Sequence, residues 1–388
     1  MTNRRDFLTA GAMGAAFSAI GSPASAQTAL PAGTQPPSES LLGKSFAETA
    51  APKLWTLPQR PASPVSIDIH THWAPEAYLK AKAEFGQPDF LDPINYDMDR
   101  RIAWMDTRGV QALVLTLGGF RPWGWVTPEQ GAHIARVTND AAIDVHKSYP
   151  SRFHAGIEVN CSDPRGSLAE LNRMAGKPGM VCLHLPTSLA GRDFMFDPDF
   201  APVLARAEAL SLPIILHPLD GAPNWFGGHR LADAASGASP NASPAGNRFP
   251  GLTNSLGNSL EIAVCMSKLM ASGTLDRYPN LTFIAQHAGG ALPYVGGRLE
   301  NRGGGTLKKP AYEYLRRFYY DSLAYWPDSL RYLVHMVGPD RVVLGTDNMF
   351  GPGPLMVDQP HSVIDHAGLA DADRDLILSG NLKRLLAI

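Results

Sequence analysis

Cysteines are few in this sequence. The 388 residues include only Cys161, Cys182 and Cys265, which lie far apart. Three scattered cysteines exclude a disulfide framework and a zinc site built from cysteines. We expect all three to be buried as small apolar side chains.

An excess of charge of either sign is also missing. The sequence has 34 Lys and Arg against 36 Asp and Glu, a formal net charge of −2. Because no basic excess is present to neutralise phosphates, we expect no nucleic-acid partner. Hydrophobic residues make up 44% of the chain, which is enough for a sizeable core and excludes a disordered protein.

The apolar run near the N-terminus, from about Ala10 to Ile20, is too short to cross a bilayer, so we expect no stable membrane anchor. It follows Arg4-Arg5-Asp6-Phe7-Leu8 and precedes Ala24-Ser25-Ala26, a pattern typical of a twin-arginine export signal. We predict such a signal over residues 1–26, the twin-arginine export machinery as a partner, and a periplasmic location. An ordinary secretory signal or a short anchor is the alternative. Residues 27–64, rich in Pro and Ser, are predicted to form an extended arm.

Residues 65–388 contain eight short apolar runs separated by stretches compatible with helices. Most runs are continuously apolar rather than alternating, which is typical of parallel strands buried on both faces. The runs are Val65–Ile69, Ala112–Thr116, Phe153–Val159, Met180–Leu185, Pro213–Leu216, Leu281–Ala285, Phe318–Tyr320 and Arg341–Leu344. The helix-compatible stretches are Asn95–Arg108, Gly131–Tyr149, Ser167–Ala175, Phe200–Leu210, Leu260–Leu275 and Asp328–Val337.

This order predicts an α/β protein with a single (β/α)8 barrel. A doubly wound open sheet is the alternative, but neither a G-x-G-x-x-G nor a Walker loop is present to favour it. One connection is long, from Leu219 to Ser259 after the fifth run. Loops of that length are usually functional, and we expect a lid or an oligomer contact.

Five polar side chains stand where apolar runs end. His70 and His72 close the first run, His217 the fifth and His287 the sixth, and Asp347 follows the eighth. Barrel enzymes build their active sites at these carboxyl ends of the strands. Burying so many polar groups without interactions among them or with a common ligand would be costly, so the set indicates a shared site.

The chemistry of this set suits a metal ion. Side chains alternate along a strand, so the spacing of His70 and His72 directs both imidazoles into the barrel mouth, and Asp68 has the same parity. Neutral imidazoles with a carboxylate favour Zn²⁺, with Mn²⁺ also possible. We assign His70, His72, His217 and Asp347 as metal ligands. His287 is not assigned as a ligand, and we predict that it acts as a general acid or base. Asp347 is predicted to transfer protons in addition to binding the metal.

Together these residues resemble the amidohydrolase superfamily, in the branch of aminocarboxymuconate-semialdehyde decarboxylase and the resorcylate decarboxylases. The motifs that carry the resemblance, which spans residues 65–388, are Asp68-Ile69-His70-Thr71-His72, His217-Pro218, His287-Ala288-Gly289-Gly290, Gly345-Thr346-Asp347 and Gly380-Asn381-Leu382-Lys383-Arg384-Leu385. The resemblance implies the same four ligands, a catalytic His287 and a homodimer. It also implies one metal ion, because the fourth strand lacks the bridging lysine of binuclear members. His184 stands on that strand, either near the metal or as a core or supporting residue.

The loop after the second strand indicates an aromatic or dienoic acid as the substrate. It reads Gly118-Gly119-Phe120-Arg121-Pro122-Trp123-Gly124-Trp125, an arginine among aromatic rings. Such an arginine can bind a carboxylate while the rings stack on a planar substrate. We therefore predict Arg121, Trp73 and Trp225 as substrate contacts; the alternative is that the rings pack the loops or a dimer interface. Asp321 is either a substrate contact or a structural hydrogen-bonding residue.

Two reactions fit the same residues. The first is non-oxidative decarboxylation, in which His287 or Asp347 manages the proton that replaces CO₂. The second is metal-dependent hydrolysis of a lactone, ester or amide. Arg121 and its aromatic neighbours favour decarboxylation, whereas a periplasmic location favours hydrolysis. A binding protein that has lost catalysis is the remaining interpretation.

Overall fold

The structure is a computed structural model that describes residues 66–86, 95–118, 121–124, 126–189, 191–219, 252–303, 305–348 and 359–388. The predicted export signal, the predicted arm, Trp225 and most of the long loop after the fifth run lie outside these residues. No helix in the described ranges is long and apolar enough to cross a membrane.

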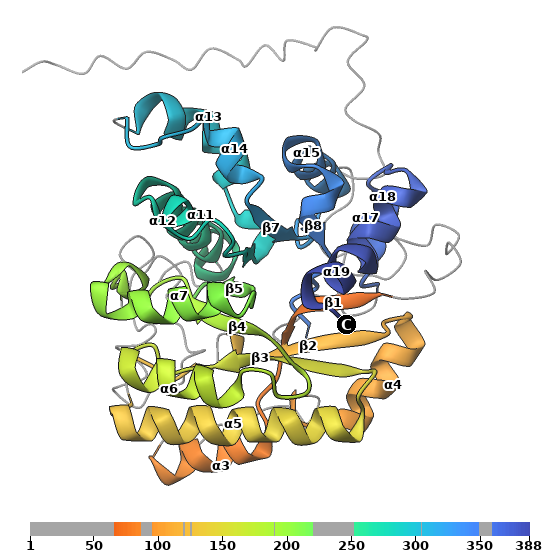
Figure 1. The fold of residues 1–388 in the computed structure, drawn as a ribbon. Helices are drawn as coiled ribbons and strands as arrows, with labels where there is room; N and C mark the ends of the chain where they lie inside the picture. Colours follow the sequence, from red (N-terminus) through yellow and green to blue (C-terminus); the bar gives the residue numbers. More distant parts are fainter. Residues whose placement is uncertain are drawn as a thin grey trace, which may run out of the picture. The chain divides into compact units, whose positions relative to one another are not determined.

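Eight parallel strands lie side by side in chain order, with helices around them (Figure 1), which confirms the predicted (β/α)8 barrel. The strands are β1 (Ile67–His72), β2 (Ala112–Thr116), β3 (Phe153–Glu158), β4 (Met180–Pro186), β5 (Ile214–His217), β6 (Phe283–Ala285), β7 (Phe318–Asp321) and β8 (Val342–Val343). All eight coincide with predicted runs, and β2 has the predicted bounds.

The segment after β8 returns to β1 and completes the ring. The backbone N–H of Ile69 donates to the carbonyl of Leu344 at 3.0 Å, and that of His72 donates to Asn348 at 3.1 Å. In return, the N–H of Asn348 donates to the carbonyl of His70 at 3.3 Å. We call these hydrogen bonds the closing seam.

A bulge interrupts the regular alternation of β1. Asp68 pairs with Leu113 and Thr71 with Leu115, so β1 uses one residue more than β2 over this interval. In a regular strand, Ile67 and His72 would point to opposite faces. The extra residue inverts the alternation between them, so both side chains point to the same face. The expectation that Asp68 shares the inward parity of the histidines was wrong. Asp68 instead accepts hydrogen bonds from the N–H and hydroxyl of Thr346.

The helices begin where the sequence supplies caps. Asp97 accepts hydrogen bonds from two backbone N–H groups at the start of α4, Asp163 caps α6, and Thr127 with Gln130 forms a capping box for α5. The longer helices are α3 (Glu76–Glu84), α4 (Met98–Arg108), α5 (Pro128–Ser148), α6 (Pro164–Met174), α7 (Ala201–Ala209), α11 (Asn258–Ala271), α13 (Leu292–Arg302) and α15 (Pro327–Val337). The shorter ones are α12 (Thr274–Arg277), α14 (Ala311–Leu315), α17 (Ser362–His366), α18 (Asp371–Asp375) and α19 (Asn381–Leu386). The helix-compatible stretches given above do not include α3, α13, α14, α17, α18 or α19.

Two apolar clusters hold the barrel together. The larger one packs the strands against the surrounding helices. The smaller one contains inward side chains such as Ile67, Val114 and Ile284, and Leu382 and Leu386 of α19 pack against them. The three cysteines are free and buried, as predicted. The interior below the strand ends is therefore filled, which leaves the carboxyl ends for the polar site.

Candidate metal centre at the carboxyl ends of the strands

The structure brings the four predicted ligands together. His70, His72, His217 and Asp347 each offer one nitrogen or oxygen atom, and these atoms all lie within 4.8 Å of one another. Oδ1 of Asp347 is 2.8 Å from Nε2 of His72 and 3.2 Å from Nε2 of His70. Three imidazoles and one carboxylate at this spacing fit a divalent metal ion.

Hydrogen bonds at the Nδ1 atoms fix the orientation of two of these rings. Nδ1 of His70 lies 2.6 Å from Oδ2 of Asp321, and Nδ1 of His217 lies 2.5 Å from the carbonyl oxygen of Pro218. With Nδ1–H donating outward in both rings, each Nε2 keeps its lone pair for a metal. Nε2 of His70 is buried, and the polar atom beside it at 3.2 Å is Oδ1 of Asp347, another predicted ligand.

The electrostatics of the centre favour positive charge between the ligands. Burial alone would lower the pKa of His70, but the carboxylates of Asp347 and Asp321 raise it to about 10. Burial alone would raise the pKa of Asp347, but His70 and His72 hold it well below its usual range. Burial keeps the pKa of His217 well below that of a free histidine. The negative carboxylates favour a positive charge at this place, and a bound metal ion would supply it.

Glycine permits the close approach of the loop after β2. At Gly118, which has a φ of +52°, an added Cβ atom would collide with the ring of His72. Any side chain at Gly118 would therefore displace a predicted metal ligand.

His287 stands beside the four ligands on a strained turn. Its ring centroid is 5.0 Å from that of His70 and 5.5 Å from that of His217. His287 and Ala288 have φ values of 52° and 54°, and Asp347 has 57°. Residues other than glycine adopt such angles only where their surroundings hold them, and they cluster at functional sites.

Asp321 supplies that support. Its carboxylate accepts hydrogen bonds from the backbone N–H groups of His287 at 3.0 Å, Ala288 at 2.6 Å and Leu323 at 3.1 Å, besides the bond from His70. Of the two roles left open by the sequence, the structure shows the structural hydrogen-bonding one. The buried Nε2 of His287 has no partner, and burial lowers the pKa of this histidine to about 4.

His184 forms a pair with a residue that the sequence analysis missed. Its Nδ1 lies 2.6 Å from Oε1 of Glu158, which also accepts the N–H of Leu117 at 2.8 Å. Burial lowers the pKa of His184 to about 4. His184 is not one of the grouped ligands. The position of Glu158, an acidic residue inside the third apolar run, was the signal that could have identified it.

The predicted substrate contacts have different surroundings. Arg121 is buried; its Nε donates to the carbonyl of Gly118 at 2.8 Å and its Nη2 to that of His217 at 3.0 Å. It therefore lies directly against the metal centre. Trp73 and Trp123 belong to the larger apolar cluster, as the packing alternative expects.

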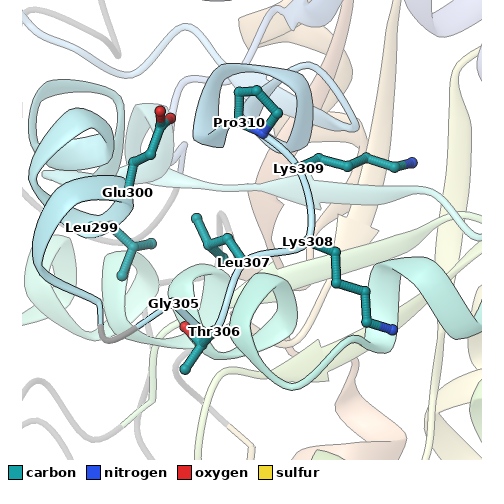
Figure 2. Close-up of a pocket in the computed structure, with 8 residues that line it drawn as sticks. All are labelled: Leu299, Glu300, Gly305, Thr306, Leu307, Lys308, Lys309 and Pro310. Carbon is teal, nitrogen blue, oxygen red and sulfur yellow. The ribbon is translucent and has the colours of Figure 1, made fainter.

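A separate hollow lies on the outer helices. Figure 2 shows it between α13 and α14, lined by Leu299, Glu300, Gly305, Thr306, Leu307, Lys308, Lys309 and Pro310. None of these residues belongs to the candidate metal centre.

Several known proteins are similar to this chain. An aminocarboxymuconate-semialdehyde decarboxylase of Dictyostelium discoideum is 23% identical, over 84% of this chain and 92% of its own. A gamma-resorcylate decarboxylase of Rhizobium sp. is 26% identical, over 83% of this chain and 98% of its own. The solved structure of a dihydroxybenzoic acid decarboxylase from Polaromonas sp., with manganese and the inhibitor 2-nitroresorcinol, matches with a TM-score of 0.68 and 23% identity, over 84% of this chain and 97% of that one.

A family model agrees with the resemblance that the motifs carry. The model described as amidohydrolase matches residues 67–388, which include every strand of the barrel and all four grouped ligands. The chain belongs to the amidohydrolase family.

Proposed function

We propose that this protein is a metal-dependent, non-oxidative decarboxylase of an aromatic or dienoic carboxylic acid. The observation that carries the proposal is that relatives named as decarboxylases match 83–84% of this chain and 92–98% of their own lengths. The grouped ligands, with His287 beside them, support it chemically.

His70, His72, His217 and Asp347 would hold the ion, which we propose to be Zn²⁺, with Mn²⁺ as the alternative. A divalent metal there would supply positive charge that binds the carboxylate, or an adjacent oxygen, of the substrate. Asp321 would keep His70 in its ligating orientation.

The chain's own residues would manage the proton. When the bond to the carboxylate carbon breaks, CO₂ leaves and the electron pair stays on the substrate carbon, which must then gain a proton. His287, whose lowered pKa keeps the ring neutral at rest, would take up a proton from water at its unpartnered Nε2 and pass it to this carbon, and its turn is fixed by Asp321. Asp347 would be the second residue able to handle protons.

Arg121 would bind the carboxylate end of the substrate. Two carbonyl oxygens already orient its guanidinium, so little side-chain freedom would be lost on binding. Substrate contacts by Trp73 and Trp225 stay predictions.

A mass-spectrometric substrate screen tests the proposal. The metal-loaded protein is incubated with aromatic carboxylic acids, lactones and esters, beside a chelator-treated control. We expect metal-dependent loss of CO₂ from an acid. Addition of water to a lactone or ester, without loss of CO₂ from any acid, would instead make the protein a hydrolase.

We also propose that residues 1–26 direct twin-arginine export to the periplasm and that the protein is a homodimer. The paired Arg4 and Arg5 support the first, and the superfamily resemblance supports the second. Cell fractionation of an Arg4→Lys/Arg5→Lys variant tests export, which should stop. Light scattering of the purified protein tests the dimer.

A further inference from the structure

Glu261 lies in the first turn of α11 and connects the segments that follow β4 and β5. Its Oε1 accepts hydrogen bonds from the hydroxyl of Thr187 at 2.5 Å, the hydroxyl of Ser188 at 2.9 Å and the backbone N–H of Leu219 at 3.2 Å. Thr187 and Ser188 follow β4, and Leu219 follows β5. Neither the metal binding nor the proton transfer proposed above involves this buried carboxylate.

The hydrogen bond from Leu219 acts on a peptide group that also serves the metal centre. Pro218 and Leu219 share this group: its carbonyl oxygen belongs to Pro218 and its N–H to Leu219. The carbonyl oxygen lies 2.5 Å from Nδ1 of His217, and the N–H donates to Glu261. One peptide group therefore stands between a predicted metal ligand and the carboxylate of α11.

The planarity of the peptide group transmits the constraint. Its C–N bond has partial double-bond character, so the directions of the carbonyl and the N–H are fixed relative to each other. β5 ends at His217, which pairs with Pro186 of β4, so this strand pairing stops before the peptide group in question. The hydrogen bond from Leu219 to Glu261 therefore fixes the direction of the Pro218 carbonyl.

That carbonyl determines which nitrogen of His217 carries the proton. A carbonyl oxygen only accepts, so Nδ1 is the donor and Nε2 keeps the lone pair that a metal needs. If the peptide group turned, Nδ1 would lose its acceptor, and the neutral ring could carry its proton on Nε2, where it blocks coordination. His70 has a carboxylate in direct contact with its Nδ1, that of Asp321, whereas His217 has one behind a peptide group.

We propose that Glu261 is a positioning residue of the metal centre. Through the peptide group between Pro218 and Leu219, it holds His217 in the orientation and the tautomer that bind the ion. The hydroxyls of Thr187 and Ser188 keep the carboxylate in place, so its Oε1 is a fixed acceptor. The inference rests on the proposed function only in taking His217 as a metal ligand.

Nitrogen-15 NMR of histidine-labelled, metal-free protein tests the tautomer directly. The signals that disappear in His217→Ala belong to His217, and in the wild type they should show a protonated Nδ1 and a bare Nε2. In Glu261→Met, whose side chain offers no oxygen to Leu219, part of this signal should change to the form protonated on Nε2. Titration with Mn²⁺ should show an affinity about tenfold or more weaker, as for the loss of other groups that orient metal-ligating histidines.

Glu261→Gln is the conservative variant, and it keeps the test decisive if Glu261→Met folds poorly. Its amide oxygen can still accept the N–H of Leu219, whereas the negative charge that favours the N-terminus of α11 is lost. This variant should therefore keep the wild-type tautomer and nearly the wild-type affinity for Mn²⁺.

Two further variants separate the peptide contact from other effects. Thr187→Val removes one donor to the same oxygen but leaves the Leu219 contact, so both the tautomer and the affinity should equal those of the wild type. Glu300→Met is the matched control, because Glu300 accepts the backbone N–H of Ala311 at 2.7 Å outside the metal centre. It should also behave as the wild type.

The wild-type tautomer in Glu261→Met would overturn the proposal whether or not the affinity falls, because the carboxylate would then support the fold alone. Equal loss of affinity in Thr187→Val, or in Glu261→Gln, would overturn it as well. The proposed function fails separately: if the wild type decarboxylates no acid while its tautomer and Mn²⁺ affinity depend on Glu261, the positioning role stands and the reaction is wrong.

Discussion

A single oxygen of Asp321 connects a predicted metal ligand to the proposed proton donor. Oδ2 accepts the Nδ1–H of His70 at 2.6 Å and the backbone N–H of His287 at 3.0 Å. The position of His287 relative to the metal centre is therefore set by one buried carboxylate rather than by two independent supports.

Replacement of Asp321 by Asn should disturb both functions at once. The amide oxygen can keep some of the four hydrogen bonds, but the amide NH₂ would face donors. We expect metal affinity to fall by about 10–100-fold, as for the loss of other groups that orient metal-ligating histidines. Titration with Mn²⁺ measures this. Asp328→Asn, on the exposed surface of α15, is the control. Wild-type affinity in Asp321→Asn would show that His70 needs no such support.

Removal of His217 should empty the metal centre. His217→Ala deletes one of three imidazoles in a group whose atoms lie within 4.8 Å of one another. We expect metal content, measured by inductively coupled plasma mass spectrometry, to drop well below stoichiometry. The exposed His335→Ala should retain the ion. Full occupancy in His217→Ala would remove this histidine from the ligand set.

Loss of His287 should spare the metal and slow the reaction. His287→Asn should keep wild-type metal content, because the ring is not among the four grouped ligands. Turnover should fall on the order of a hundredfold or more, a typical effect of losing a general acid or base. His133→Asn, on exposed α5, is the control for histidine loss. An unaltered rate would exclude His287 as the proton donor.

Arg121 should affect substrate binding more than chemistry. Arg121→Ala removes the proposed carboxylate contact, and we expect KM to rise by the equivalent of about 2–3 kcal/mol. Metal content must be measured in parallel, because Arg121 also supports the backbone of His217. An unchanged KM in the fully loaded variant would contradict the carboxylate role.

Stability should fall at acid pH through histidines outside the metal centre. Burial lowers the pKa of His361 to about 4, whereas in the unfolded chain it is near 6.5. Asp365 raises this pKa and Arg374 lowers it, but burial dominates. Because the unfolded state binds the proton first, the stabilisation is complete above about pH 6.5 and is lost as the pH falls towards 4.

Urea unfolding of wild type and His361→Gln between pH 7 and 4 measures this effect. Across that range, the free energy of unfolding of the wild type should fall by on the order of 3 kcal/mol more than that of the variant. Parallel pH profiles for the two proteins would show that His361 does not titrate on unfolding.

The barrel and its ligand positions were readable from the sequence because each depends on local pattern. Apolar runs mark buried parallel strands, and polar residues at their ends fall at one edge of the ring. The bulge in β1 was not readable, since it depends on how Asp68 and Thr71 pair with the neighbouring strand. The short α14, with five residues, carried too little periodicity to be recognised.

The supporting contacts of the site were the other part beyond sequence reasoning. Asp321 could be named but not assigned, because its four donors come from three separate segments. Glu158 was overlooked because its partner His184 is on another strand and only the register of β3 and β4 brings them together. Arg121 gained two carbonyl contacts that no motif encodes.

The predicted metal ligands lie on both sides of the closing seam. His70 and His72 come from the first strand and Asp347 from just beyond the last, and the hydrogen bonds of Asn348 run between them. An ion held by these residues would link the first strand of the barrel to the segment after the last strand. Because such an ion would bind the folded barrel and not the unfolded chain, metal loading should raise the free energy of unfolding.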